Sequence, residues 1–369
     1  MAKPLRALGL MSGTSLDGID VAMLTTDGEN VVERGPSATY PYPPEFCGAL
    51  RQALADAVAI TGRSQRPGGL ADVERELTER HADAVSSFLA AHGIEASSID
   101  VIGFHGQTVL HRPEDQLTVQ LGDGWNLARI TGLDVVYDLR AADVAAYGWG
   151  APLVPVYHRA VAARIPQRPV AFLNVGGVAN VTWIGGDGNL IAFDTGPGNA
   201  QLDDFVRERT GQPFDEGGWL TASGCVNADL VRRFMSHPYF AAPPPKSLDR
   251  NSFALDLPAT LSNADGAATL AGYTANAVVR ARAWLPAPPE LWIVCGGGRH
   301  NRGIMLALAA ALDAAVAPAE AIGLNGDSIE AEAWAYLAVR SLRGLPISFP
   351  MTTGVPAPMT GGVLARGRK

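Results

Sequence analysis

Residues 7–31 read ALGLMSGTSLDGIDVAMLTTDGENV, and residues 170–194 read VAFLNVGGVANVTWIGGDGNLIAFD. Each stretch begins with an apolar run and passes a turn rich in Gly and polar residues. A second apolar or β-branched run, an Asp-Gly turn and a third run follow. Runs punctuated in this way predict antiparallel strands joined by hairpins. The sequence therefore predicts the same three-stranded meander twice, once in each half of the chain.

A later pair of segments repeats in the same order. Residues 99–104 lead into HGQT, and residues 291–294 lead into CGGGR, so each reads as a buried strand ending in a Gly-containing loop. Between these predicted strands, apolar residues recur at helical spacing, which predicts helices there. The pattern predicts an α/β chain of two similar lobes around a central cleft, where small ligands usually bind. We place the boundary after Arg140, giving lobes 1–140 and 141–369, with the final segment allowed to pack back on the first.

The composition excludes several classes of protein. The chain has 369 residues, with 29 basic and 37 acidic side chains and a net charge of −8. Such a balance does not favour phosphate neutralisation, so we expect no nucleic-acid partner. Three scattered cysteines are too few for a disulfide framework, and no apolar stretch approaches the roughly 20 residues of a membrane span. With no recognisable secretion signal, the sequence favours a cytoplasmic protein without membrane attachment.

Three loops have the composition of a nucleotide site. Residues 13–20 lack the Lys of a P-loop but offer backbone N–H groups and hydroxyls to phosphate oxygens. Asp17 or Asp20 could hold Mg²⁺, directly or through water, because this ion prefers few carboxylates. The alternative is that Asp17 only makes a tight turn. Residues 176–177 could bind the same phosphates, and the glycines at 296–298 would let a flat base approach the backbone.

Two carboxylates are candidates for work on a substrate. Asp194 directly follows a predicted strand, and a carboxylate at a strand end beside a cleft suits a general base. It could instead cap the next helix, but Asn199 lies nearer the helix start, so we favour the catalytic role. Glu330 follows Asp327 by three residues, which is a capping-box spacing. For Glu330, a capping role and a substrate role both stay open.

These motifs, in this order, resemble the anhydro-N-acetylmuramic acid kinase family of the sugar kinase–Hsp70–actin superfamily. The most specific is MSGTSLDGID at 11–20. Also similar are GFHGQT at 103–108, GAPLVP at 150–155, NVGGVAN at 174–180, FDTGPGN at 193–199, PPKS at 244–247 and GDSIEA at 326–331. The resemblance implies a duplicated ribonuclease-H-like (actin-like ATPase) fold. It also implies ATP-dependent phosphorylation and hydrolytic opening of 1,6-anhydro-N-acetylmuramic acid, giving N-acetylmuramic acid 6-phosphate in peptidoglycan recycling.

The resemblance also assigns roles to residues of this sequence. Asp194 takes the position of the catalytic base, and the sugar-binding positions are Gln107, Thr108, Arg140 and Glu330. The nucleotide-binding positions are Gly13, Thr14, Ser15, Leu16, Asp17, Gly18, Ile19, Asp20, Gly176, Gly177, Gly296, Gly297 and Gly298. ATP and Mg²⁺ are the implied cofactors, and a small anhydro sugar is the implied partner. The oligomeric state stays open, with a homodimer among the choices.

One carboxylate is enough for this chemistry. Inverting glycosidases need a base and an acid, but here O6 can attack the γ-phosphorus as it leaves, so the phosphoryl group replaces the acid. Arg140 suits the lactyl carboxylate, because a guanidinium can bind it with two hydrogen bonds.

Trp149 and the pair Ala141-Ala142 depart from the family pattern, which leaves the sugar's substituents open. The alternatives are a kinase of another anhydro sugar, such as levoglucosan, and a non-catalytic nucleotide-gated protein of the actin or chaperone type.

Overall fold

The computed structural model describes every residue except 1, 14, 249–252, 254, 256 and 368–369. The chain forms two compact units, residues 1–163 with 328–369 and residues 164–327. The boundary that we placed after Arg140 lies inside the first unit, and the chain returns to that unit at Ser328. Within the described residues, no helix combines the length and apolar character needed to cross a membrane.

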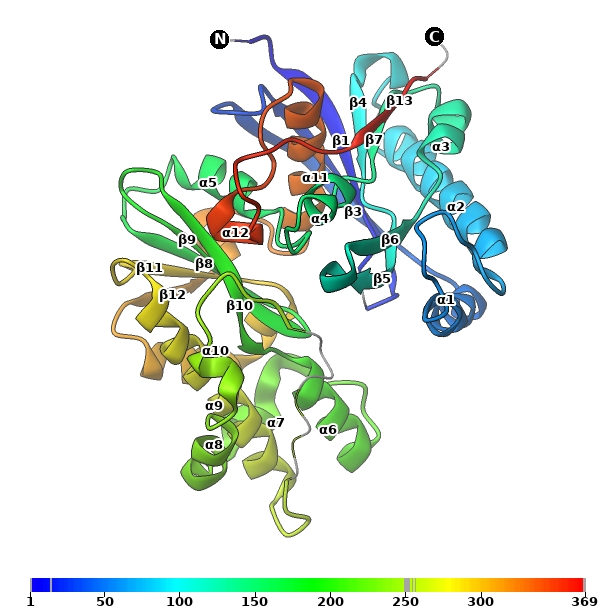
Figure 1. Ribbon diagram of the computed structural model, residues 1–369. Helices are drawn as coiled ribbons and strands as arrows, with labels where there is room; N and C mark the ends of the chain where they lie inside the picture. The colour runs from blue at the N-terminus through cyan, green and yellow to red at the C-terminus, as the bar shows by residue number, and fades with distance from the viewer. Residues whose placement is uncertain (1, 14, 249–252, 254, 256, 368–369) are drawn as a thin grey trace. The chain divides into compact units, whose positions relative to one another are not determined.

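The first unit is built on a six-stranded sheet with the order β13-β7-β4-β1-β2-β3 (Figure 1). Strands β1 to β3 form an antiparallel meander, β4 lies parallel to β1 and β7 parallel to β4, and β13 closes the edge antiparallel to β7. A hairpin of β5 and β6 follows β4. The bounds are β1 (Leu5–Met11), β2 (Gly18–Thr26), β3 (Val32–Pro41), β4 (Val101–Phe104), β5 (Gln107–Arg112), β6 (Leu117–Leu121), β7 (Val135–Tyr137) and β13 (Val363–Ala365).

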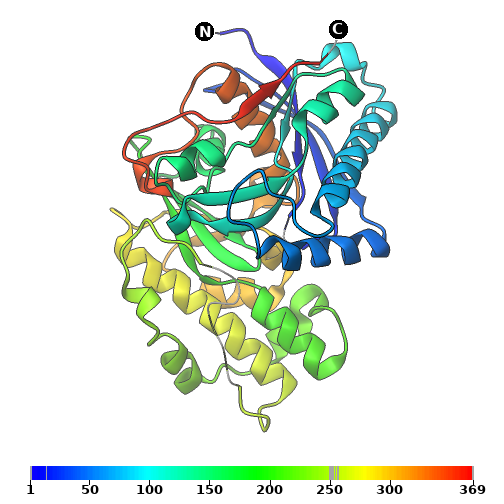
Figure 2. The same cartoon turned by 45° about the vertical axis from the view of Figure 1, so that its right-hand side comes forward.

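Helices cover both faces of this sheet. One face, with Leu8 and Phe104, packs against α1, α2 and α3, whose apolar residues recur at helical spacing, and α11 lies on the other face (Figure 2). The helices are α1 (Pro44–Ala57), α2 (Leu70–Ala91), α3 (Gly124–Thr131), α4 (Ala141–Ala145), α5 (Pro155–Ala162), α11 (Ile329–Leu342) and α12 (Pro350–Thr353).

Two strand glycines let α11 approach the sheet. A Cβ on Gly9 would lie 1.7 Å from the carbonyl oxygen of Ala331, and a Cβ on Gly103 would lie 2.0 Å from that of Trp334. These contacts are backbone contacts, so no rotamer change can relieve them. The glycines therefore set how closely the helix that begins at Ile329 packs on β1 and β4.

Gly103→Ala is expected to destabilise the first unit by roughly 1–3 kcal/mol, the usual cost of overpacking a core. Gly48→Ala is the matched control, because Gly48 lies inside α1 with no atom within 4 Å of an added Cβ. That change should stabilise the helix by roughly 0.5–1 kcal/mol. Urea unfolding measures both. Equal shifts of the two variants in the same direction would contradict the close packing of α11.

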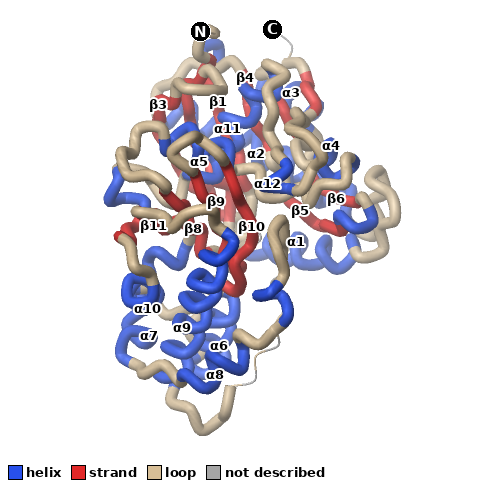
Figure 3. Tube along the Cα trace, turned by 60° about the vertical axis from the view of Figure 1, so that its left-hand side comes forward, coloured by secondary structure: helices blue, strands red, loops and turns tan. Residues whose placement is uncertain are grey.

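The second unit has a five-stranded sheet with the order β10-β9-β8-β11-β12. Strands β8 to β10 lie side by side as an antiparallel meander, with helices of the unit packed beside them (Figure 3), and β11 and β12 run parallel to β8. The bounds are β8 (Val170–Val175), β9 (Val178–Ile184), β10 (Leu190–Pro197), β11 (Leu291–Cys295), β12 (Ala315–Pro318), α6 (Ala200–Thr210), α7 (Trp219–Ser223), α8 (Ala228–Phe234), α9 (Asn263–Ala281) and α10 (Arg302–Ala311).

The two sheets share one topology. In each, the first strand of the meander lies between its antiparallel neighbour and a parallel strand: β1 between β2 and β4, and β8 between β9 and β11. The predicted α/β class and the predicted duplication are confirmed. The β1–β2 turn and the β8–β9 turn consequently occupy equivalent places in their units.

Candidate active site

The β1–β2 turn is a short exposed loop with a buried anchor. Leu16 has a positive φ of 57° and a buried side chain, while the Ser15 hydroxyl donates to Asp17 Oδ1 at 2.7 Å. A Cβ on Gly18 would lie 2.6 Å from a carbonyl oxygen of β3, so the sheet requires that glycine. Gly13 meets nothing closer than 3.7 Å. Packing therefore does not explain Gly13, which leaves its backbone open to a ligand. Thr14 lies outside the described residues.

The β8–β9 turn is open in the same way. A Cβ on Gly176 or Gly177 would meet no atom closer than 3.6 Å, and neither residue has a positive φ. Protein packing therefore does not demand glycine at either position. The backbone can be approached there by a bulky group, as a phosphate-binding turn requires.

The glycines after β11 have a different cause. Gly296 has φ 71°, and its added Cβ would lie 2.3 Å from Asn174 Oδ1. A Cβ on Gly298 would lie 2.4 Å from the Val175 side chain. Close packing on β8 thus accounts for these two. At Gly297 the nearest atom is the Asn199 amide nitrogen, at 3.3 Å, so only this position keeps the predicted role of admitting a flat base.

The predicted magnesium ligands lie at the start of β2. Asp20 Oδ1 accepts from the Thr39 hydroxyl at 2.5 Å, and Asp17 is exposed. In the described parts of the chain, no three His, Cys, Asp or Glu side chains form a metal-binding group. Mg²⁺ usually takes one or two carboxylates and completes its shell with phosphate oxygens and water. The carboxylates of Asp17 and Asp20 fit that pattern.

Asp194 lies within β10 and not directly after it, because the strand continues to Pro197; the pairing with β9 shifts register between Asp194 and Gly196. Its Oδ2 accepts from the Leu248 N–H at 2.8 Å, its own N–H donates to the Lys246 carbonyl at 3.1 Å, and its carbonyl accepts from the Tyr239 hydroxyl at 2.6 Å. Burial raises the pKa of Asp194 to about 7, against the lowering effects of the Leu248 N–H and the Lys246 ammonium. A carboxyl that titrates near neutrality suits a general base.

The capping alternative for Asp194 is wrong. Helix α6 begins at Ala200 with Asn199 in the N-cap position, and no side chain caps it. The Asn199 amide instead donates to the Val175 carbonyl at 3.2 Å, and its Oδ1 is buried with no partner in the described structure. Asp194 therefore has no structural duty at this helix.

Arg140, in the first unit, is held by neutral groups. Its Nε and Nη2 lie 3.3 and 3.2 Å from His105 Nε2, and its Nη1 donates to the Gly150 carbonyl at 3.0 Å. The guanidinium carbon lies 5.5 Å from the Trp334 ring centre. In the described part of the chain, no carboxylate oxygen lies within 4.0 Å of this guanidinium. The carboxylates of Glu330 and Asp143 act on its charge from a longer distance.

His105 fixes the direction of Arg140. Burial, with help from the Arg140 charge, lowers the pKa of His105 to about 3, so the ring is neutral. The hydrogen-bond network assigns the proton to Nδ1, which lies 3.2 Å from the Ser12 carbonyl, and leaves Nε2 to accept from Arg140. The ring also packs against Trp334, with 4.6 Å between ring centres and an angle of 35° between the ring planes. No sequence pattern predicts this role of His105, since it depends on contacts between segments that are distant in the sequence.

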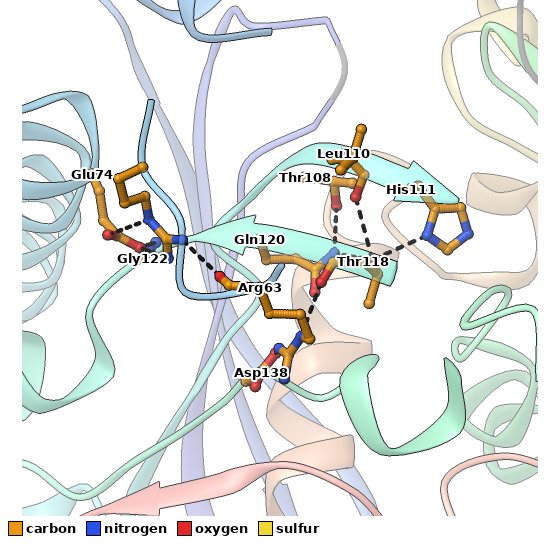
Figure 4. A network of polar contacts seen from close by, with 10 residues as sticks. Arg63, Glu74, Thr108, Leu110, His111, Thr118, Gln120, Gly122 and Asp138 are labelled. Atoms are coloured by element: carbon orange, nitrogen blue, oxygen red, sulfur yellow. Dashed lines mark hydrogen bonds and ion pairs between the residues drawn. The ribbon is translucent and has the colours of Figure 1, made fainter. Parts of the chain in front are cut away.

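Two other predicted sugar-binding residues, Gln107 and Thr108, come from β5, close to His105 in the sequence. The buried Gln107 accepts from the Ser12 hydroxyl at 2.7 Å, so its Oε1 serves to join β5 to β1. Thr108 Oγ1 lies 3.5 Å from His105 Nε2 and 3.4 Å from Gln120 Nε2, in the hairpin network of Figure 4. Gln107 is therefore engaged by the fold, whereas Thr108 lies beside the Arg140 site.

Glu330 lies in the first turn of α11, which begins at Ile329 after the N-cap Ser328. No side chain caps this helix, so the capping-box alternative is wrong. Burial raises the pKa of Glu330; the charge of Arg140 opposes this shift, and that of Asp20 adds to it. These mutual effects bring three predicted residues of the first unit into one electrostatic group: Asp20, Arg140 and Glu330.

A pocket of about 270 Å³ is lined by His105 together with Arg63, Gln120 and Asp138, among others. Arg63 pairs with Asp138 at 2.5 Å (Figure 4), so its charge is neutralised. This pocket contains none of the predicted sugar-binding residues. Asp194 and the glycines at 176–177 and 296–298 belong to the second unit.

A family model for anhydro-N-acetylmuramic acid kinase matches residues 5–366. The anhydro-N-acetylmuramic acid kinase of Agrobacterium fabrum is 53% identical over 366 residues, covering 98% of this chain and 98% of that protein. The enzyme of that name from Nitrobacter winogradskyi is 54% identical over 367 residues, covering 98% and 99%. The chain belongs to the anhydro-N-acetylmuramic acid kinase family.

Likeness to solved structures is weaker. Component A of the (R)-2-hydroxyglutaryl-CoA dehydratase of Acidaminococcus fermentans is 12% identical, with a TM-score of 0.48, and covers 91% of this chain and 99% of that one.

The loop in which this member of the anhydro-N-acetylmuramic acid kinase family has Trp149 is firmly tied. The Asp143 carboxylate accepts from the Gly150 N–H at 2.6 Å and from the Thr353 hydroxyl at 2.6 Å. The Trp149 N–H donates to the Thr353 carbonyl at 2.7 Å. Asp143 thus fixes the loop whose Gly150 carbonyl receives Arg140. Sequence reasoning missed Asp143, as well as Lys246 beside Asp194.

Proposed function

We propose that this chain is an ATP-dependent anhydro-N-acetylmuramic acid kinase. It opens 1,6-anhydro-N-acetylmuramic acid with water, phosphorylates O6 and gives N-acetylmuramic acid 6-phosphate for peptidoglycan recycling. Family membership supports the substrate and the reaction. The observation that carries the mechanism is Asp194, a carboxyl at a register shift of β10 with no capping duty and with a pKa raised by burial to about 7.

Asp194 is the proposed base. It takes a proton from the water molecule whose oxygen bonds to C1 of the sugar. The C1–O6 bond breaks with inversion, and O6 takes the γ-phosphoryl group of ATP, so that ADP leaves. Because O6 leaves toward phosphorus, no second carboxylic acid is needed to protonate it. Leu248 holds Oδ2 of the base through its N–H and leaves Oδ1 to receive the proton.

The open backbone at Gly13, Gly176 and Gly177 is proposed to bind the phosphates of ATP, and Gly297 is proposed to lie beside the adenine ring. Phosphoryl transfer depends mainly on positioning and charge neutralisation, which backbone N–H groups supply. When bound, Mg²⁺ would neutralise phosphate charge, and Asp17 or Asp20 would hold it, directly or through water.

Arg140 is proposed to bind the lactyl carboxylate. Its guanidinium has no carboxylate within 4.0 Å in the described structure, and His105 and Gly150 hold it from the protein side. A half-buried cation whose hydrogen bonds all go to neutral acceptors can still form charge-assisted hydrogen bonds to an anionic ligand. Thr108 and Glu330 are proposed to bind neutral parts of the sugar.

In ¹⁸O-labelled water, the label is expected at C1 of the product, with the α anomer formed first, because water and not phosphate oxygen attacks C1. Mass spectrometry and NMR of the product measure both. Label in inorganic phosphate would instead mean plain ATP hydrolysis. A mixture without sugar is the control, and it also tests the alternative of a non-catalytic nucleotide-gated protein, for which ADP release would not depend on the sugar.

A further inference from the structure

Lysine is almost absent from this chain. Of its 29 basic side chains, 26 are arginines and three are lysines: Lys3, Lys246 and Lys369. Two of these lie within a few residues of the chain ends. Lys246 is therefore the one lysine in the body of the sequence, where the protein otherwise uses arginine. A compact ammonium that can lose its proton differs chemically from a planar guanidinium that does not.

The backbone around Lys246 lies along Asp194. The Lys246 carbonyl accepts from the Asp194 N–H at 3.1 Å, and two residues later the Leu248 N–H donates to Asp194 Oδ2 at 2.8 Å. On another side, the Tyr239 hydroxyl donates to the Asp194 carbonyl at 2.6 Å. Residues 239–248 thus hold both the main chain and the carboxylate of Asp194.

The Lys246 side chain folds back into this same segment. It is 9% exposed, and its Nζ donates to the Tyr239 carbonyl at 3.0 Å. Nζ also lies 4.4 Å from the centre of the Tyr239 ring and 5.8 Å from that of Phe193, the residue before Asp194. In the described residues, the ammonium has this single acceptor and no carboxylate within 4.0 Å. Such a buried cation depends on longer-range attraction.

The charges of Lys246 and Asp194 act on each other. Burial and the charge of Arg280 on α9 together lower the pKa of Lys246 to about 8, against the raising effect of Asp194. Burial raises the pKa of Asp194, and the Lys246 ammonium opposes that shift. Asp194 also raises the pKa of Tyr239, which burial has already raised. Lys246 is the cation that favours the ionised form of Asp194.

We propose that Lys246 is a positioning residue for Asp194: its carbonyl holds the main chain of Asp194, and its ammonium keeps the Asp194 carboxylate ionised and able to accept a proton. The inference rests on the proposed role of Asp194 as the base.

The first test is the pH profile of kcat/KM with anhydro-N-acetylmuramic acid. Activity falls below the pKa of Asp194, and removing the ammonium raises that pKa. In Lys246→Met the acid limb should therefore move up by about one pH unit, the lower end of the effect of an opposite charge. The loss should be about tenfold at pH 6 and less than twofold at pH 9. An equal loss at every pH would overturn the proposal.

Two further variants separate charge from shape. Lys246→Arg keeps the charge, so its acid limb should stay at the wild-type pH, although the bulkier group lowers the plateau. An acid limb that moves as far as in Lys246→Met would overturn the proposal. Lys3→Met removes an exposed lysine from the first unit and should leave the profile unchanged.

The second test does not depend on catalysis or on the stability of a Lys246 variant. Labelling the lysines with ¹³C and ¹⁵N gives side-chain signals from three residues. The Lys246 signal titrates in wild-type protein and in Asp194→Asn, where loss of the negative charge should lower its pKa by about one unit or more. An unchanged titration would overturn the proposal even if Asp194 is the base. If Asp194→Asn stays active while the titration shifts, the proposed function fails and the charge coupling stands.

Discussion

Asp194→Asn is expected to lower kcat at least about a hundredfold, the usual minimum share of a well-placed general base. The amide is nearly isosteric and can still accept from the Leu248 N–H, but it cannot take a proton from water. The Asp194 backbone contacts to Lys246 and Tyr239 do not involve the carboxylate. Sugar-dependent ADP release in a coupled assay measures kcat. Near-normal turnover would remove Asp194 from the role of base.

Two controls separate lost chemistry from lost structure. Asp313→Asn changes an aspartate whose side chain is 94% exposed, and it should leave kcat unchanged. Thermal melting of Asp194→Asn tests the fold. Because burial raises the pKa of Asp194 from 3.8 to about 7, the ionised carboxylate lowers the free energy of unfolding as pH rises through that range. The variant should therefore melt at a higher temperature than wild type at pH 8, and the two should converge near pH 4.

Arg140→Met is expected to raise KM for anhydro-N-acetylmuramic acid by about ten- to a hundredfold, because a hydrogen bond to a charged group contributes about 1.5–3 kcal/mol. The thioether chain fills part of the space beside Trp334 but offers no charge. Levoglucosan has no lactyl carboxylate, so whatever weak binding it shows should not change. Initial rates against sugar concentration measure both substrates.

The Arg140 prediction also has a matched control. Arg129→Met removes a guanidinium of α3 that bonds Asn126, and both KM values should stay at wild-type levels. If Arg140→Met weakens both sugars equally, Arg140 supports the site without reading the carboxylate. If levoglucosan is the better substrate of wild-type protein, the alternative of a kinase for that sugar is favoured.

Local sequence was enough to predict the two meanders. Strand ends at Met11 and Val175 are marked by Gly-rich turns, and α2 by apolar residues at helical spacing from Leu70. The limits of the units were harder to predict. Residues 328–369 join the first unit through contacts of α11 with β1 and β4, and such long-range packing leaves only the small residues Gly9 and Gly103 as a signal.

In the candidate site, too, features marked by local sequence could be predicted, and features that depend on long-range contacts could not. Asp194 could be found because it follows an apolar run, although β10 in fact continues past it to Pro197. Asn199 takes the N-cap position of α6, as its place in the sequence predicts, but its side chain does not cap the helix. The use of His105 to orient Arg140 could not be found, because it joins the ends of β4 and β7 through a neutral ring. Likewise, the sequence around Gly296 matches a ligand-binding loop. Packing alone also requires glycine there, because an added Cβ would lie 2.3 Å from Asn174 Oδ1 on β8.

The discontinuity of the first unit has a consequence for how the protein is made. Residues 164–327 are contiguous and carry their own sheet and core, so they can fold as soon as they leave the ribosome. The N-terminal strands wait longer, because their covering helix α11 and edge strand β13 are synthesised only after residues 164–327. The unit whose synthesis begins first is therefore completed second, and the sheet face around Gly9 and Gly103 stays uncovered until α11 has been made.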